Sequence, residues 1–291
     1  MATFLYIGLG ALLLALFYGL WVEPAWRLRV KRYRVEHPAW GDRAPVRIVI
    51  ISDLHAGAPH IPLSRVSRIV RKANRLNPDI AVLLGDYGAA HSWTIGKMSK
   101  RAILERLKPF EGRFGTFAVL GNHDWWQDPG SAEGRRPCEA QTALSELEIP
   151  HLDNEAARIE HEGGDFWVVG LADQRPLDEG PDGEGFDDID LAIADVTDDA
   201  PCILLAHEPD LFPNVPEQCI LTLSGHTHGG QIRIGNRSPV IMASENETFS
   251  YGRYDAQGRV LIVSGGIGCS EIPVRIGMPP EITVVTICGE T

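Results

Sequence analysis

The sequence predicts a layered α/β fold preceded by a transmembrane helix, and three observations support this interpretation. Beyond residue 45, short runs of apolar and β-branched residues alternate with segments that have helical spacing, as in α/β proteins. Several of these runs are followed directly by Asp, Asn or His, at the loop positions where α/β proteins carry their chemistry. Residues 3–22, in contrast, contain no charged side chain.

The N-terminal segment TFLYIGLGALLLALFYGLWV, residues 3–22, is long enough to cross a bilayer. About twenty residues that rise about 1.5 Å each span a hydrocarbon core of about 30 Å. A cleaved signal peptide is the alternative, but no basic residue precedes the apolar run and no small-x-small cleavage site follows it. We therefore expect a membrane anchor over residues 1–25.

The segment that follows, residues 26–45, is a basic linker. Its positive charges near the span are Arg27, Arg29, Lys31, Arg32 and Arg34. Because short basic flanks tend to stay in the cytoplasm, we expect a single-pass protein of the inner or cell membrane whose main domain, residues 46–291, is cytoplasmic. The stretch WRLRVKRYRV also alternates apolar and basic residues, which suits either an edge strand or a strip lying on anionic lipid headgroups.

Eight apolar runs in the main domain are predicted to form buried strands. They are residues 46–51, 79–84, 116–120, 166–170, 202–206, 220–223, 261–264 and 282–287. Apolar residues at helical spacing predict three helices, around residues 66–76, 103–107 and 140–147.

The overall composition narrows the function. A formal net charge of −12 disfavours proteins that bind the nucleic acid backbone, because such proteins concentrate Lys and Arg, so we expect no nucleic acid partner. The five cysteines are widely spaced and form no close pair, which indicates free thiols in a reducing compartment.

Five short motifs of metal-binding type follow the predicted strands. They are SDLH with Asp53 and His55, GDY with Asp86, GNHD with Asn122 and His123, AHEPD with His207, and GHTHGG with His226 and His228. Any one of these residues is more often a helix cap or a hydrogen-bonded polar group than a ligand. Together they place carboxylate, amide and imidazole groups on adjacent strand ends, which we expect one sheet to bring to one crevice.

Two of these motifs contain a pair of candidate ligands separated by one residue. The steps from Asp53 to His55 and from His226 to His228 are expected to leave both side chains on the same side of an extended backbone. The glycines of GHTHGG would let the chain turn tightly there. Each pair can then reach a shared site.

In this order, the motifs resemble those of the calcineurin-like metallophosphoesterase superfamily: Asp-x-His, Gly-Asp, Gly-Asn-His-Asp, His, and Gly-His-x-His. The resemblance covers roughly residues 46–287. It is strongest to a membrane-anchored bacterial branch of YkuE and YaeI type, which shares the anchor, the SDLH opening and the GHTHGGQ ending. It implies an α-β-β-α fold, a layered β-sandwich flanked by helices.

The resemblance also implies roles for individual residues. One metal ion would be held by Asp53, His55, Asp86 and His228, and a second by Asp86, Asn122, His207 and His226, with Asp86 as the bridge. The ions are divalent or trivalent, and Mn, Fe and Zn all suit such ligands. His123 would be the general acid, with Asp124 orienting its ring; alternatively, His123 only hydrogen-bonds Asp86 or a phosphate oxygen.

The implied activity is metal-dependent hydrolysis of a phosphoester. Two ions about 3.5 to 4 Å apart can clamp the ester and convert a shared water molecule to hydroxide. The anchor favours a phosphodiester or a membrane-associated substrate, lipid-linked or nucleotide. A specific alternative is cleavage of the pyrophosphate of UDP-2,3-diacylglucosamine in lipid A synthesis, as in one relative of the branch. A non-catalytic membrane scaffold is a minor alternative, which the complete ligand set disfavours.

Five further residues have open interpretations. Asp173 follows a predicted strand and is either an acidic site residue or a loop cap, and we leave it out of the metal set. Trp125 and Trp126 either contact the substrate or pack in the core. The histidines outside the motifs are interpreted as ordinary surface or loop residues, and among them His60 and His91 are the best candidates to line the cleft.

Overall fold

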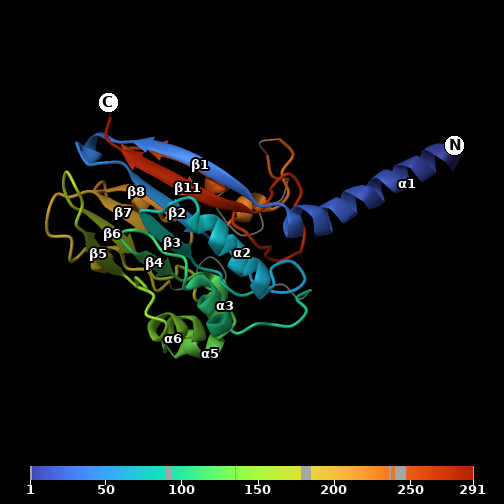
Figure 1. Cartoon of the computed structure of the whole chain (residues 1–291), viewed down its shortest axis with the longest axis horizontal. Coiled ribbons are helices and arrows are strands. Elements are labelled where there is room, and N and C mark those ends of the chain that lie inside the picture. The colour runs from blue at the N-terminus through green and yellow to red at the C-terminus, as the bar shows by residue number, and fades with distance from the viewer. Residues whose placement is uncertain are drawn as a thin grey trace.

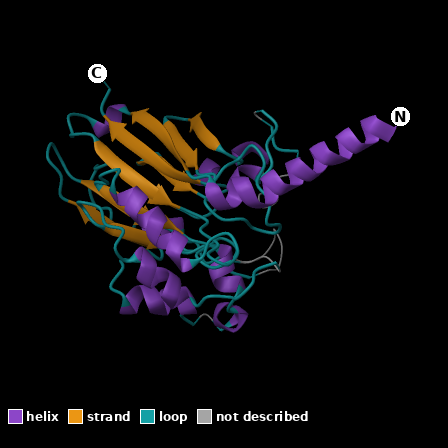
Figure 2. Ribbon diagram, turned by 45° about the vertical axis from the view of Figure 1, so that its right-hand side comes forward, coloured by secondary structure: helices purple, strands orange, loops and turns teal. Residues whose placement is uncertain are grey.

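The computed structural model describes residues 2–89, 93–134, 136–177, 185–235, 237–239 and 247–290, and His91 lies outside them. Two mixed sheets form the body of the molecule (Figures 1 and 2). The first has the order β1-β11-β2-β3-β4, with β1 Arg29–Glu36, β2 Val46–Ile51, β3 Ile80–Leu84, β4 Thr116–Val119 and β11 Glu281–Cys288. The second has the order β5-β6-β7-β8-β10-β9, with β5 Glu155–Ile159, β6 Phe166–Gly170, β7 Cys202–Leu205, β8 Cys219–Ser224, β9 Gly252–Ala256 and β10 Arg259–Val263.

Helices cover the outer faces of the sandwich. The helices of the main domain are α2 Leu63–Asn74, α3 Lys100–Leu107, α4 Asn122–Trp126, α5 Pro129–Glu133, α6 Glu139–Glu146 and α7 Ile189–Ala192. Short 3₁₀ turns lie at η2 Pro38–Trp40, η3 Phe212–Asn214, η4 His228–Gly230 and η5 Glu247–Phe249. Alternate residues of β2 show the layering, because Ile48 and Ile50 pack between the sheets while Val49 and Ile51 pack under α2 and α3. The predicted α-β-β-α fold is confirmed.

All eight predicted strands and all three predicted helices form. Two strands, β5 and β9, were not predicted from the sequence. They lie at the two edges of the second sheet and pair antiparallel with one neighbour each. Their sequences, EAARI and GRYDA, contain a single buried residue between them and lack the apolar run that marks a buried strand.

The N-terminal helix α1, Ala2–Phe17, projects from one end of the sandwich (Figure 1). It continues into a π-helical segment, η1 Tyr18–Trp26, so that residues 3–26 form one apolar helix. In its most apolar 18-residue window only 6% of the residues are buried, which excludes a core helix of the domain. The length and exposure suit a membrane span, and a signal sequence would share them.

The C-terminal end of this helix is attached to the domain by Arg65 of α2. The buried guanidinium donates from Nη1 to the Pro24 carbonyl at 2.6 Å and from Nη2 to the Arg27 carbonyl at 3.2 Å. The last carbonyls of a helix lack partners within the helix, so these bonds satisfy them and set where the chain leaves it. The chain then enters β1, the edge strand of the first sheet, as one interpretation of WRLRVKRYRV predicts.

Candidate metal centre

The seven predicted ligands meet at one end of the sandwich. Each follows the carboxyl end of a strand: Asp53 and His55 follow β2, Asp86 follows β3, Asn122 follows β4, His207 follows β7, and His226 and His228 follow β8. Strands β2 to β4 belong to the first sheet and β7 and β8 to the second. The expectation that one sheet would supply all the ligands is therefore wrong. The ends of two facing sheets enclose a crevice on more sides than one sheet edge can.

The backbone at the site is strained. Five of the seven residues have left-handed φ angles: Asp53 49°, His55 39°, Asp86 56°, His226 67° and His228 52°. The extended backbone expected for the two ligand pairs is thus incorrect, and the chain instead turns sharply at each ligand. Non-glycine residues adopt this region at a cost of about 1 to 3 kcal/mol each, which other contacts must offset, and such residues cluster at functional sites.

The first cluster of potential ligands contains Asp53, His55, Asp86 and His228, whose ligand atoms all lie within 4.8 Å of one another. The Nε2 atoms of His55 and His228 are 3.0 Å apart, and Asp53 Oδ1 is 3.7 Å from His228 Nε2. All four side chains are buried. Imidazole nitrogens and carboxylate oxygens at these separations form a donor set that suits one transition-metal ion.

The second cluster lies around His207 and His226. His226 Nδ1 is 3.1 Å from Asn122 Oδ1 and 3.9 Å from Glu208 Oε1, and His207, Glu208 and His226 form a second group of potential ligands. Asp86 connects the clusters, since its Oδ2 is 3.3 Å from both His55 Nε2 and His207 Nε2.

Backbone carbonyls orient two of the imidazoles. His207 Nδ1 lies 2.6 Å from the Leu84 carbonyl, and His55 Nδ1 lies 3.3 Å from the Gly88 carbonyl. Each carbonyl requires a proton on the Nδ1 that faces it, which leaves Nε2 unprotonated and able to bind a metal ion. His207 Nε2 is buried and makes no hydrogen bond. An orphaned buried nitrogen of this kind fits a missing metal ligand bond.

The electrostatics of the carboxylates differ within the site. Burial raises the pKa of Asp53. Burial also acts to raise the pKa of Asp86, but the interactions of its carboxylate with the neighbouring His207, His123 and His55 rings outweigh burial and hold that pKa well below its usual range. Asp86 is therefore the carboxylate that stays ionised between the two clusters, as a bridging ligand must.

The Asp124 carboxylate is buried and accepts hydrogen bonds from the surrounding loops. It accepts hydrogen bonds from the backbone nitrogens of Asp86 at 2.8 Å, Tyr87 at 3.1 Å and Gly121 at 3.1 Å, and from Lys100 Nζ at 3.0 Å. Both oxygens are engaged, and these bonds hold the loop that carries Asp86. Lys100 had no signal in the sequence, because a lysine at the start of a predicted helix is usually exposed.

The His123 ring lies beside the first cluster. It packs edge-on against His55 at 5.1 Å and Trp126 at 4.8 Å between ring centroids, and its Nε2 is 3.4 Å from Ser270 Oγ. Burial lowers the pKa of His123 to about 4, so the ring is neutral at neutral pH until a negative charge approaches it. Trp125 packs in the core, where its ring contacts Phe186 edge-on, whereas Trp126 packs against the His123 ring.

Two buried acids were missed or set aside in the sequence. Glu208 directly follows His207 and was not considered, because Glu-Pro after a strand resembles a turn; burial raises its pKa to about 7. Asp173 is also buried, and burial together with the charge of Glu208 raises its pKa well above the usual range. Residue 60, expected in the cleft, contacts the N-terminal helix instead: His60 Nε2 donates to the Leu20 carbonyl at 2.7 Å.

Comparisons with known proteins agree with this geometry. Residues 46–230 match the model of the calcineurin-like phosphoesterases. This chain belongs to that family. It is a metallophosphoesterase, and its buried His and Asp clusters form a candidate dinuclear metal site.

Three relatives of this phosphoesterase illustrate its neighbourhood. A transmembrane protein with metallophosphoesterase domain from Danio rerio is 32% identical over 83% of this chain and 53% of its own length. An uncharacterized metallophosphoesterase from Aquifex aeolicus is 29% identical over 90% of this chain and 93% of its own length. The uncharacterized metallophosphoesterase YkuE from Bacillus subtilis is 26% identical over 83% of this chain and 78% of its own length. The phosphoesterase spans about half the length of the Danio rerio and Bos taurus proteins.

Proposed function

We propose that this metallophosphoesterase is a membrane-anchored hydrolase in which two metal ions share Asp86. One ion would be held by Asp53, His55, Asp86 and His228, and the other by Asp86, Asn122, His207 and His226. The observation that carries the proposal is the position of Asp86 Oδ2, at 3.3 Å from an imidazole nitrogen of each cluster. Glu208 lies close enough to His226 to assist the second set.

The chemistry follows from the positions of the chain's own side chains. When bound, two cations would lower the pKa of a water molecule and neutralise charge on the phosphoryl group. His123 lies beside the first cluster, where the negative charge of a bound phosphate would raise its pKa and let it protonate the leaving oxygen. Asp124 acts on this reaction through the Asp86 loop, and its hydrogen bonds describe a positioning role.

The N-terminal helix completes the proposal. In this proposal residues 1–25 are the anchor, 26–45 the basic linker with β1, and 46–291 the phosphoesterase domain, and the basic flank supports a cytoplasmic position for that domain. The similarity to the transmembrane protein with metallophosphoesterase domain from Danio rerio supports a membrane anchor. The substrate is then a phosphoester at the membrane, lipid-linked or nucleotide.

The experiment is hydrolysis by metal-stripped protein after addition of Mn²⁺, with Asp86→Ala and His123→Ala as variants. The substrates are bis-p-nitrophenyl phosphate, p-nitrophenyl phosphate and UDP-2,3-diacylglucosamine. Manganese-dependent turnover that both variants lose supports the assigned site, and the preferred substrate separates diesterase, monoesterase and pyrophosphatase. Bound manganese without turnover on any substrate would support a non-catalytic membrane scaffold instead.

A further inference from the structure

Large exposed hydrophobic residues are concentrated at one end of this molecule. Outside the N-terminal helix, those among the described residues are Trp93, Ile95, Leu191 and Ile234, which are 68%, 72%, 58% and 76% exposed. Leu191 lies in α7, over the second sheet. The other three belong to the segments 93–99 and 231–235, and both segments lie at the end of the sandwich from which α1 projects (Figure 1).

The first loop connects Trp93 and Ile95 to the anchor. Ile95 N donates to the Ala58 carbonyl at 3.0 Å, which ties this loop to the segment after the ligand His55. In that same segment, His60 donates to the Leu20 carbonyl of the helix and packs edge-on against Trp21. The segment that contains Ala58 and His60 therefore contacts both this loop and the end of the helix.

The second loop connects Ile234 to the anchor from another direction. It follows the ligand His228, and Arg233 N donates to the Ile276 carbonyl at 2.8 Å. The neighbouring Arg275 N donates to the Gly19 carbonyl of the helix at 3.0 Å. This contact is close, because a Cβ atom at Gly19 would lie 2.7 Å from Ile276 Cγ1.

Exposed basic residues accompany the apolar ones. Lys97 follows Ile95, Arg237 follows Ile234, and Arg27 ends the helix. Tryptophan with Lys or Arg beside apolar side chains is the composition that membrane interfaces favour, and cytoplasmic leaflets carry anionic lipids. The apolar helix continues directly into this surface, so the occupant that the structure favours is the bilayer that the helix would cross.

We propose that Trp93, Ile95 and Ile234 form a bilayer rim, whose side chains enter the headgroup region of an anionic membrane on either side of the anchor. Trp93 lies seven residues after Asp86 and Ile234 six residues after His228, so docking of the rim would hold the metal-binding end of the domain at the lipid surface. The substrate class that this geometry selects is the phosphorylated headgroup of a membrane amphiphile. This inference rests on the proposed anchored hydrolase and deepens it.

Depth of insertion can be measured on the full-length chain in nanodiscs. The five native cysteines are buried, so a fluorophore would react selectively with Ile95→Cys, Ile234→Cys or the control Leu191→Cys. Spin-labelled lipids should quench the fluorophore at positions 95 and 234 and leave position 191 unaffected. Equal, weak quenching at all three positions would overturn the rim.

Activity provides the second arm. Ile95→Asp combined with Ile234→Asp should leave hydrolysis of soluble bis-p-nitrophenyl phosphate unchanged and lower hydrolysis of a lipid-embedded phosphoester by about tenfold, because charged side chains no longer enter the interface. Leu191→Asp should change neither. An unchanged lipid activity in the double variant would overturn the proposal. If the unmodified chain hydrolyses nothing, the proposed function fails, while the quenching experiment still decides whether the rim inserts.

Discussion

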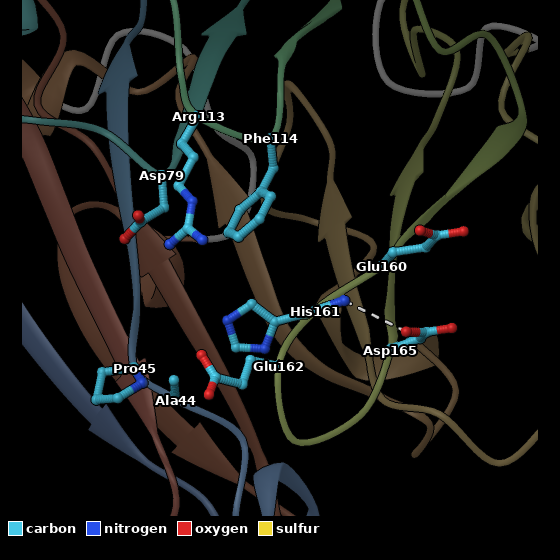
Figure 3. Close-up of a pocket in the computed structure, with 9 residues that line it drawn as sticks. All are labelled: Ala44, Pro45, Asp79, Arg113, Phe114, Glu160, His161, Glu162 and Asp165. Atoms are coloured by element: carbon cyan, nitrogen blue, oxygen red, sulfur yellow. Dashed lines mark hydrogen bonds between the residues drawn. The ribbon is translucent and has the colours of Figure 1, made fainter.

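The two ends of the sandwich use the same residue types with different results. At the carboxyl ends of the parallel strands, Asp and His side chains are buried, strained and close together. At the amino ends lies a cavity of 430 Å³, whose lining also includes four acidic residues and a histidine. The lining residues are Ala44, Pro45, Asp79, Arg113, Phe114, Glu160, His161, Glu162 and Asp165. Figure 3 shows that the carboxylates of Glu160 and Asp165 point away from the His161 ring.

The comparison shows what separates a metal site from an acidic cavity. Within the described residues, neither group of potential metal ligands includes a residue of the amino-end cavity. There Asp165 accepts from the backbone N of His161 at 3.2 Å and bonds the exposed Arg158, so its charge is already compensated. At the carboxyl ends, in contrast, Asp86 Oδ2 faces two imidazole nitrogens at 3.3 Å and no arginine, which is the arrangement of a metal site.

The largest expected difference between the two ends is in catalysis. Asp86→Asn should lower turnover on any substrate that the enzyme accepts by about 10³-fold or more, because the bridging charge between the clusters is lost. Glu160→Gln, in the amino-end cavity, should leave turnover within about twofold, as expected for an exposed charge. Steady-state kinetics at saturating Mn²⁺ measure both. Similar losses in the two variants would contradict the comparison.

Ion pairs at the two ends should differ in stability. Lys100 and Asp124 are both buried, with Nζ and Oδ1 3.0 Å apart, so Lys100→Met should lower the free energy of unfolding by about 3 kcal/mol and leave a buried charge unpaired. Arg158 and Asp165 pair at 3.0 Å near the surface, and Arg158→Met should cost less than about 1 kcal/mol. Chemical denaturation of the two variants gives the difference, and equal costs would refute it.

Stabilisation of the protein by Mn²⁺ should depend on the site at the carboxyl ends and not on the amino-end cavity. At about 100 times the dissociation constant, Mn²⁺ would add about 2.7 kcal/mol to the free energy of unfolding, since it binds the folded state alone. The gain should disappear in His207→Ala and persist in His161→Ala. Thermal unfolding with and without Mn²⁺ tests this. If His161→Ala instead abolished the stabilisation by Mn²⁺, the metal would bind in the amino-end cavity and the prediction would be wrong.

The smallest expected effect concerns the histidines near each end. Burial lowers the pKa of His60 below 6.5, partly offset by its bond to the Leu20 carbonyl, and burial also lowers that of the less buried His161. A lowered folded pKa means that the unfolded chain takes up the proton first, so stability is full above pH 6.5 and falls as the pH drops below it. His60→Gln, which can still donate to Leu20, should flatten the fall in unfolding temperature between about pH 7 and 5 more than His161→Gln does. An identical slope in all three proteins would show that His60 does not titrate on unfolding.

The sequence predicted what depends on local pattern. The apolar runs identified the buried strands, and the position of Asp53, Asp86 and His207 after such runs identified the candidate ligands. The edge strands β5 and β9 were not predicted, because they form by pairing with a neighbouring strand and their own residues lack a strand pattern. The roles of Glu208 and Lys100 were not predicted for a similar reason, because loops distant in the sequence bury these two side chains.

The pairing of β1 with β11 has a consequence for biogenesis. The two strands run parallel in register from Arg29 with Glu281 to Glu36 with Cys288. During synthesis β1 leaves the ribosome long before β11, because the other strands of both sheets lie between them in the sequence. The first sheet therefore cannot close until β11 has been translated, and until then β1 and the facing edge of β2 lack their partner strand. A ribosome stalled shortly before residue 281 should hold a phosphoesterase domain whose first sheet is still open to proteases.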